Sequence, residues 1–178
     1  MSFLELATRR QSTRAYLDKP VPRDVIDRCI EAARLAPSAC NSQPWSFVVA
    51  DSGPVRTQLV DAAFSGVYSM CAFAKAAPVI IVATRDRSTY TAKLGAFFRG
   101  SEFNLIDIGI ACEHLVLQAE EEGLGTCWLG WFNEAGVRRM LGLPRRTKID
   151  VMITMGYPAD PALRPKTRRS LDEVRKYA

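Results

Sequence analysis

Apolar and polar positions follow two periods along this chain, one typical of helices and one typical of strands. Apolar residues at helical spacing predict helices at 3–10, 22–35, 54–63, 102–122 and 133–141. Short apolar runs between these segments predict strands at 45–50, 78–84, 126–129 and 149–155. The chain is therefore expected to alternate helices with strands in a single domain that spans residues 1–178.

The longest helical segment, 102–122, carries its apolar residues along one broad stripe, which is typical of a central helix. Gly123-Leu124-Gly125 follows it and predicts a left-handed cap that ends the helix. Prolines then keep the chain extended beyond residue 157, and Ser170 with Glu173 forms a capping-box pattern. We expect an arm over 158–178 that contains a short terminal helix.

Residues 85–100 keep neither period, because charged and aromatic residues are mixed there and glycines interrupt them. We expect this segment to be a partly helical cover, or lid.

The composition is that of a globular domain, with 178 residues of which 48% are apolar and 24% charged. No apolar run is long enough to span a membrane and the amino end lacks a basic leader, so we expect a cytoplasmic protein without membrane partners. Five cysteines without a C-x-x-C pair indicate reduced thiols. His114 is the only histidine and no G-x-S-x-G motif occurs, so we expect no metal and disfavour a hydrolase.

The formal charge of +5 is concentrated near the two ends of the chain. The basic residues concerned are Arg9, Arg10 and Arg14 at one end, and Arg164, Lys166, Arg168 and Arg169 at the other. Three interpretations stay open. Nucleic-acid binding lacks an accompanying recognition motif, a solvated basic surface needs no partner, and convergence on one phosphate would use the paired donors of arginine.

Residues 36–45 form a corner between a helix and a strand, stiffened by Pro37 and Pro44. The polar side chains that it presents are Ser38, Asn41, Ser42 and Gln43. They suit a ligand with both donors and acceptors, such as a flat heteroaromatic ring, although an ordinary polar loop is the alternative. A Rossmann dinucleotide site is rejected, because Gly123-x-Gly125 follows a helix and enters a strand, the reverse of the required order.

Four motifs occur in order along the chain: Arg9-Arg10-Gln11-Ser12-Thr13-Arg14, Ala36-Pro37-Ser38 with Asn41-Ser42-Gln43-Pro44-Trp45, Gly123-Leu124-Gly125 leading to Trp128-Leu129-Gly130, and Lys166-Thr167-Arg168. Taken together, they resemble the nitroreductase family of flavin enzymes. The resemblance implies an α+β fold with a mainly antiparallel central sheet flanked by helices. It also implies an intertwined homodimer with FMN bound at the dimer interface.

The resemblance assigns cofactor-binding roles by position. The phosphate and one ring edge would meet Arg10, Gln11, Ser12, Arg14, Lys166 and Arg168. The ring would meet Pro37, Ser38, Ala39 and Asn41 from the partner subunit, and would lie over Trp128, Leu129, Gly130 and Trp131. No side chain need act as an acid or base, so no catalytic residue is assigned. The chain departs from longer relatives at Ser69 and Ala72, where they place pyrimidine contacts, and at Gly130, where they often place a glutamate.

The implied activity is that of an FMN-dependent oxidoreductase. NADH or NADPH would deliver hydride to flavin N5 and be replaced by an electron-poor nitroaromatic or quinone acceptor, in a ping-pong cycle. The alternatives are a specialised enzyme of the same fold that dehalogenates aromatics or fragments flavin, and a non-catalytic flavin sensor or store. The residues leave the acceptor and the nicotinamide preference open.

Overall fold

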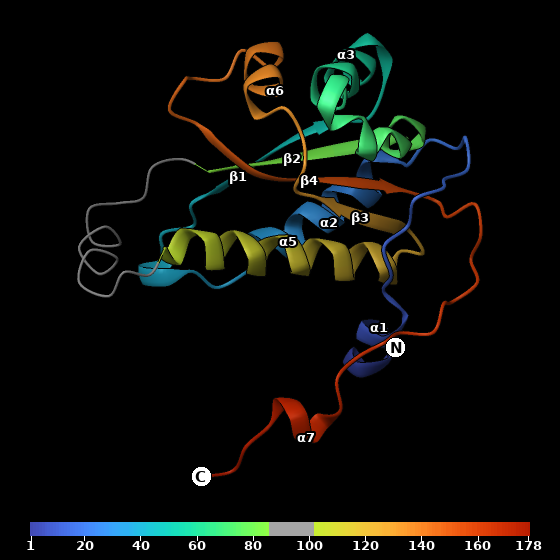
Figure 1. Cartoon of the computed structure of the whole chain (residues 1–178), viewed down its shortest axis with the longest axis vertical. Helices are drawn as coiled ribbons and strands as arrows, with labels where there is room; N and C mark the ends of the chain where they lie inside the picture. The colour runs from blue at the N-terminus through green and yellow to red at the C-terminus, as the bar shows by residue number, and fades with distance from the viewer. Residues whose placement is uncertain (86–101) are drawn as a thin grey trace.

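A computed structural model of the chain describes residues 1–85 and 102–178 (Figure 1). The lid expected at 85–100 therefore lies, apart from Arg85, outside the described residues.

One four-stranded sheet forms the centre of the molecule, with its strands in the order β1-β2-β4-β3. The strands are β1 (Trp45–Ala50), β2 (Val79–Arg85), β3 (Gly125–Leu129) and β4 (Lys148–Gly156). Every neighbouring pair is antiparallel. Each end of the predicted strands is thus confirmed to within one residue, and the α+β class with an antiparallel sheet is confirmed.

Helices cover both faces of this sheet (Figure 1). The α-helices are α1 (Phe3–Arg9), α2 (Arg23–Arg34), α3 (Gly53–Ala63), α5 (Phe103–Glu121), α6 (Glu134–Met140) and α7 (Leu171–Val174). Helices α2 and α5 lie below the sheet in this view, and α3 and α6 lie above it. Two 3₁₀ helices, η1 (Ala39–Asn41) and η2 (Gly66–Ala76), were not predicted.

The alternation of side chains along β2 divides the core into two clusters. Ile81 and its odd-numbered neighbours pack against α2 and α5, whereas Ile80 and Val82 pack against α3 and η2. Both faces of β2 are consequently buried, which explains why its sequence is an almost continuous apolar run.

The expected helix ends are confirmed. Gly123 adopts φ +74°, in the left-handed region that favours glycine. The side chain of Asn133 accepts a hydrogen bond from the N–H of Gly136 at the start of α6. Ser170 and Glu173 form the complete capping box of α7.

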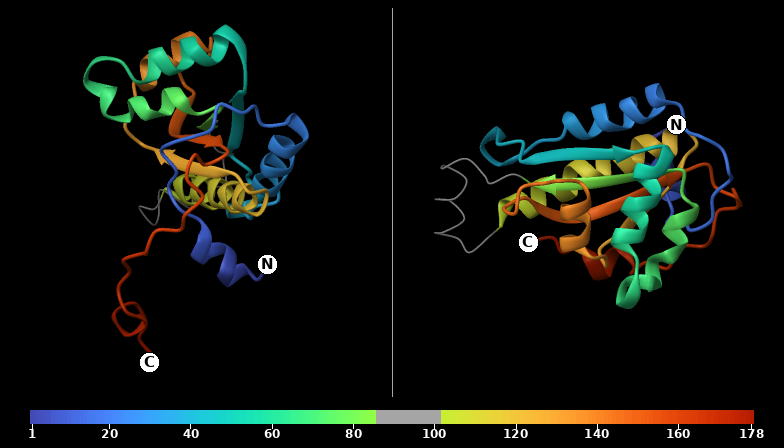
Figure 2. Two further views of the ribbon diagram at one scale, coloured as in Figure 1. Left: turned by 90° about the vertical axis from the view of Figure 1, so that its right-hand side faces the viewer. Right: turned by 90° about the horizontal axis from the view of Figure 1, so that it is seen from above.

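Both terminal segments of the chain lie outside the compact body. Helix α1 lies beside α5 on the side away from the sheet, and residues 158–178 run past α1 as an arm that carries α7 away from the body (Figures 1 and 2). Leu171 and Val174 of α7 are 63% and 56% exposed. In the part of the chain that is described, no helix combines the length and apolar character needed to cross a membrane.

Candidate functional site

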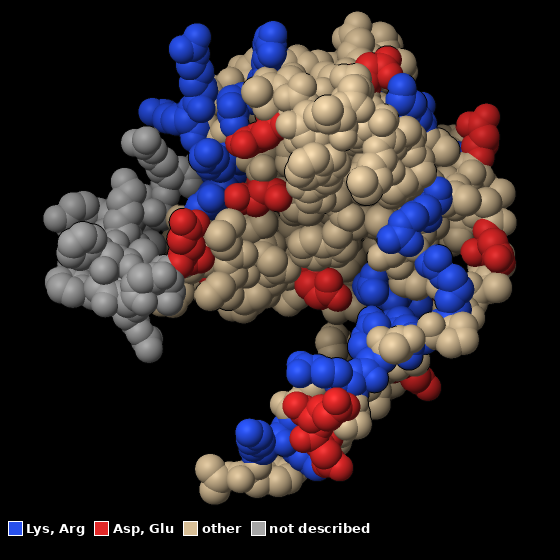
Figure 3. Space-filling model, viewed as in Figure 1, with Lys and Arg blue, Asp and Glu red and all other residues tan. Residues whose placement is uncertain are grey.

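Three of the predicted phosphate contacts form a basic cluster, made of Arg10, Lys166 and Arg168. Arg10 ends α1, and the Lys166 ammonium donates a hydrogen bond to the carbonyl of Ala7 at 2.7 Å. Burial lowers the pKa of Lys166, and the nearby charges of Arg10 and Arg168 lower it further. Lys and Arg side chains gather along the arm and where it leaves the body (Figure 3). Residues from opposite ends of the sequence thus form one positive site.

Helix α5 faces this cluster with two acids, Glu113 and Glu120. The Glu120 carboxylate lies 3.4 Å from Nε of Arg9. Burial nevertheless raises the pKa of Glu120, against the opposing effects of Arg9, Arg10 and Lys166. The acids therefore offset part of the positive charge of the cluster.

Gln11 joins the arm to the amino-terminal segment. Its side-chain amide donates to the carbonyl of Ala162 at 2.9 Å, and its side-chain oxygen accepts from Nε of Arg164 at 3.0 Å. The Arg164 guanidinium also donates to the Ser12 carbonyl. A cavity of about 220 Å³ lies beside these contacts, lined by Gln11, Thr13, Arg14, Ala15, Asp160, Ala162 and Arg164. Both polar atoms of the Gln11 side chain are therefore engaged in holding the arm.

The segment that contains Ser12 and Arg14 is aligned along the edge of β3. The backbone N–H of Thr13 donates to the carbonyl of Thr126 at 2.8 Å, and Ser12 forms a parallel bridge with Thr126. Arg14 is exposed and places its guanidinium 5.9 Å from the centre of the Phe73 ring. The backbone pairing sets the register of this basic motif relative to the sheet.

The second candidate region is the corner around η1. The hydroxyl oxygen of Ser38 accepts from the N–H of Gln43 at 2.9 Å, and the side-chain oxygen of Asn41 accepts from the Gln43 amide at 3.0 Å. Pro37 and Asn41 are exposed, whereas Ser38 and Ala39 are half-buried. The N–H of Ala39 donates to the Asp107 carboxylate of α5 at 3.0 Å. Sequence reasoning missed Asp107, whose only signal is one acid within an apolar helix pattern.

The third candidate region is the end of β3. Trp128 is half-buried, and Gly130 is exposed. Leu129 is buried in the core cluster that packs against α3 and η2. Trp131 is 54% exposed, and its indole N–H donates to the carbonyl of Val67 at 3.1 Å. The amides of Gly130 and Trp131 donate to no carbonyl within residues 1–85 and 102–178.

The corner and the basic cluster meet different parts of α5. Asp107 holds the corner near the start of the helix, whereas Glu113 and Glu120 face the cluster from its middle and its end. Asp107 lies six positions before Glu113 and thirteen before Glu120, which is about 9 and 20 Å at the helical rise. The predicted site residues therefore form separate groups within one protomer.

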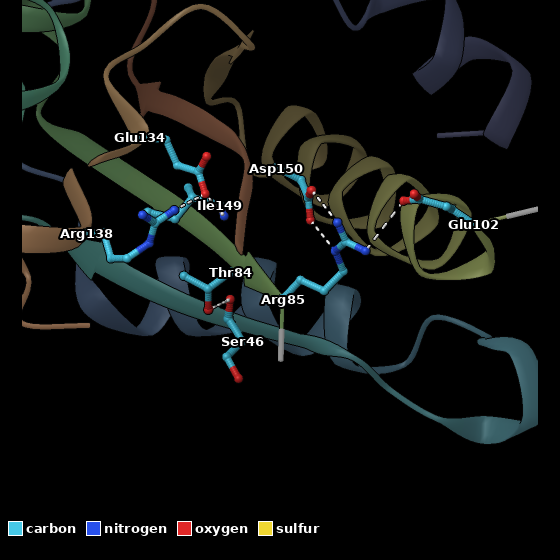
Figure 4. Close-up of polar contacts among 8 residues, drawn as sticks. All are labelled: Ser46, Thr84, Arg85, Glu102, Glu134, Arg138, Ile149 and Asp150. Atoms are coloured by element: carbon cyan, nitrogen blue, oxygen red, sulfur yellow. Dashed lines mark hydrogen bonds and ion pairs between the residues drawn. The ribbon is translucent and has the colours of Figure 1, made fainter. Parts of the chain in front are cut away.

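An ion-pair network joins β2, β4 and the start of α5 (Figure 4). The Arg85 guanidinium donates to both Asp150 oxygens, at 2.8 and 3.0 Å, and lies 3.8 Å from the Glu102 carboxylate. On β4, the N–H of Ile149 donates to the Glu134 carboxylate, which also pairs with Arg138. These contacts join the sheet to its helices.

All five cysteines are free thiols. Within the described ranges, no group of three or more histidine, cysteine, aspartate or glutamate side chains is arranged to hold a metal ion.

Comparison with known proteins identifies the family. The model of the Nitroreductase family matches residues 7–69 and 68–157. The chain belongs to the nitroreductase family. A relative in Methanothermobacter thermautotrophicus, provisionally named NADH dehydrogenase/NAD(P)H nitroreductase, is 32% identical over 98% of this chain and 85% of its own length. Rat iodotyrosine deiodinase 1 is 27% identical over 97% of this chain and 68% of its own length.

Solved structures of the nitroreductase family share the fold. A nitroreductase family protein from Streptococcus pneumoniae superposes with a TM-score of 0.82 at 28% identity, over 99% of this chain and 100% of its own. An FMN-dependent nitroreductase from Clostridium difficile has a TM-score of 0.72 at 24% identity, over 96% of this chain and 94% of its own. The second likeness is one of fold alone.

Proposed function

We propose that this protein is an FMN-dependent oxidoreductase that passes hydride from NADH or NADPH to an electron-poor acceptor, either a nitroaromatic or a quinone. The observation that carries the proposal is the basic cluster, in which Arg10 and Arg168 converge on Lys166 from opposite ends of the chain. Membership of the nitroreductase family supports the same conclusion.

The donor chemistry of the cluster fits the phosphate of FMN. Two guanidinium groups and an ammonium group supply charge-assisted hydrogen bonds, which a phosphate accepts on three oxygens. Burial lowers the pKa of Lys166, and the charges of Arg10 and Arg168 lower it further, so a bound dianion would relieve the repulsion among these three cations. A flat ring would in turn suit the exposed amides after β3 and the polar corner around η1.

We also propose that the complete site belongs to a homodimer. In one chain the corner contacts the start of α5 and the cluster faces its middle and end, so a second copy with its α5 reversed could bring one chain's corner to the other's cluster. Apolar residues exposed on α1 and α5 offer a surface for it, with Phe3 72%, Leu4 76% and Ile106 54% exposed. A Cβ atom placed on Gly109 would meet no other atom within 4 Å, so a partner could approach α5 closely there.

FMN would supply the redox chemistry, because its ring takes a hydride at N5 and can give it to a second reactant. The protein's own residues bind and orient. The N–H groups of Gly130 and Trp131, for which the described residues provide no carbonyl acceptor, would donate to the polar edge of the ring and stabilise negative charge there. One side of the pocket would be shaped by Pro37, Ser38, Ala39 and Asn41. The two reactants would stack in turn on the one exposed face of the ring, which would give a ping-pong cycle.

The proposed function is tested by the visible absorption spectrum of the purified protein, followed by reconstitution with FMN. We expect a bound flavin spectrum, and bleaching on anaerobic titration with NADH or NADPH. Addition of menadione or nitrofurazone should restore the oxidised spectrum. A protein that takes up no FMN would refute the proposal.

Reductive dehalogenation of an aromatic substrate is the second candidate, supported by the similarity to rat iodotyrosine deiodinase 1. It predicts flavin binding without rapid reduction by either nicotinamide. Release of halide from a halogenated phenol by dithionite-reduced protein would favour it over the first candidate.

A further inference from the structure

Asp107 is a buried carboxylate to which the proposed function gives no role. It is 3% exposed, and its two oxygens accept from the N–H of Ala39 at 3.0 Å and the hydroxyl of Ser42 at 3.5 Å. A carboxylate is costly to bury unless it is hydrogen-bonded. Both oxygens of Asp107 face one short segment, the corner from Ser38 to Gln43.

The corner is held in a strained conformation. Cys40, Asn41 and Gln43 have φ values of +53°, +51° and +43°, in the left-handed region that favours glycine. Asparagine tolerates this region, but cysteine and glutamine adopt it less readily. Such strain persists only where surrounding contacts enforce it, and it is concentrated at ligand sites.

The contacts that enforce the conformation come from the interior, while the opposite side of the corner is open. Asp107 holds Ala39 and Ser42 from α5, whereas Cys40 and Asn41 are exposed. We propose that Asp107 is a positioning residue that holds the Ser38–Gln43 corner in its left-handed form, so that the exposed side meets the flavin ring already shaped. The inference rests on the proposed function, since it takes the ring to be the ligand of the corner.

The geometry makes hydrogen bonding, and not charge alone, the property that matters. In Asp107→Asn, the amide oxygen can accept from Ala39 and the amide nitrogen can donate to the Ser42 hydroxyl, so both contacts survive. In Asp107→Ala, both contacts are lost. The asparagine variant should therefore rescue what the alanine variant loses.

A matched control is Asp51→Ala. Asp51 pairs with Arg23 at 2.6 Å and its side chain is 19% exposed, so its loss also removes a carboxylate with hydrogen-bonded partners. It follows the last residue of β1, whereas the corner precedes the first. The six residues of β1 place the two about 20 Å apart along the strand.

The experiment measures the FMN dissociation constant and the visible flavin spectrum of the full-length protein and these variants. Asp107→Ala should weaken FMN binding by about tenfold or more, as expected for the loss of a charge-assisted hydrogen bond, and should shift the flavin bands. Asp107→Asn and Asp51→Ala should bind FMN within about threefold of the parent. If Asp107→Ala does not fold, Asp107→Glu takes its place, because the longer side chain displaces the carboxylate by one methylene. Asp107→Glu should weaken FMN binding in the same way.

Hydrogen exchange of the Ala39 amide tests the geometry without flavin. Exchange in the FMN-free protein should be slow in the parent and in Asp107→Asn, and fast in Asp107→Ala. Equal FMN affinity of parent and Asp107→Ala would overturn the inference, as would equal losses in the asparagine and alanine variants. A parent that binds no FMN while the exchange pattern holds would instead refute the proposed function.

Discussion

The side chain of Thr13 occupies the space that a Cβ atom on Gly125 would need. A Cβ placed on Gly125 would lie 2.7 Å from Cβ and 2.8 Å from Cγ2 of Thr13, well inside van der Waals contact. The N–H of Thr13 pairs at the same place with the carbonyl of Thr126. The absence of a side chain at Gly125 therefore lets the segment with Ser12 and Arg14 lie against β3.

Gly125→Ala should displace that segment and weaken both the fold and flavin binding. Overpacking of this kind costs about 1–3 kcal/mol, which lowers the Tm of a domain of this size by several degrees. Gly130→Ala is the control for stability, because nothing lies within 4 Å of its Cβ position. Thermal unfolding of both variants checks the prediction, and equal Tm values would contradict it.

Arg168→Ala should reduce FMN affinity by about ten- to a hundredfold, because one charge-assisted contact to phosphate would be lost. Its guanidinium is exposed and donates only to the neighbouring Thr167 carbonyl among the described residues, so the fold should be unaffected. Fluorescence titration with FMN measures the loss, and riboflavin, which lacks the phosphate, should bind both proteins alike.

The control for the Arg168 variant is Arg145→Ala, which removes the same charge from an exposed residue between α6 and β4. It should leave FMN affinity within about twofold of the parent, since charges farther apart than the Debye length are largely screened. Equal losses in the two variants would mean that net charge, and not the cluster, sets the affinity.

The sheet could be predicted because its sequence signals are local. Trp45–Ala50 is confirmed at both ends, since Pro44 precedes it and Ser52 and Gly53 follow it. Helix η2 could not be predicted, because apolar residues across Gly66–Ala76 follow no single period. This helix packs against α3, and the sequence gives no local sign of that contact.

The candidate site could be predicted only in parts. The prolines at 37 and 44 locate the corner, but its support comes from Asp107, 68 residues away from Ala39. Likewise, no local pattern indicates that Gln11 binds the arm at Ala162, 151 residues later. Contacts at such separation depend on the packing of whole elements. Single motifs therefore indicate which residues belong to the candidate site, but not which distant residues they contact.

Stability should depend on pH through Glu120. Burial raises the pKa of its carboxyl, so the folded state binds the proton more tightly than the unfolded state. The resulting stabilisation is present at low pH and is lost as the pH rises through the folded pKa. Glu120→Gln should therefore raise the Tm of the FMN-free protein at pH 7, and the difference should disappear as the pH falls through the raised folded pKa to the unfolded one.

Glu5→Gln provides a control of opposite sign for the Glu120 variant. Hydrogen bonds from the backbone and side chain of Ser2 lower the pKa of Glu5, so its ionised form stabilises the fold above the unfolded pKa. This variant should lower the Tm at pH 7 and lose its effect at low pH. A Glu120 variant that behaved like Glu5→Gln would contradict the assigned effect of burial.

Mixed dimers test whether the corner and the basic cluster act across subunits. One chain would carry Arg10→Ala and the other Asn41→Ala, and each homodimer would serve as a control with two damaged sites. If the site combines one chain's cluster with the other's corner, the mixed dimer has one doubly damaged and one intact site. It should then bind one FMN with parental affinity, measured by titration after purification with two tags.

If both groups act within one chain, each site of the mixed dimer carries one defect and none binds with parental affinity. The separation of the two groups along α5 favours the first outcome.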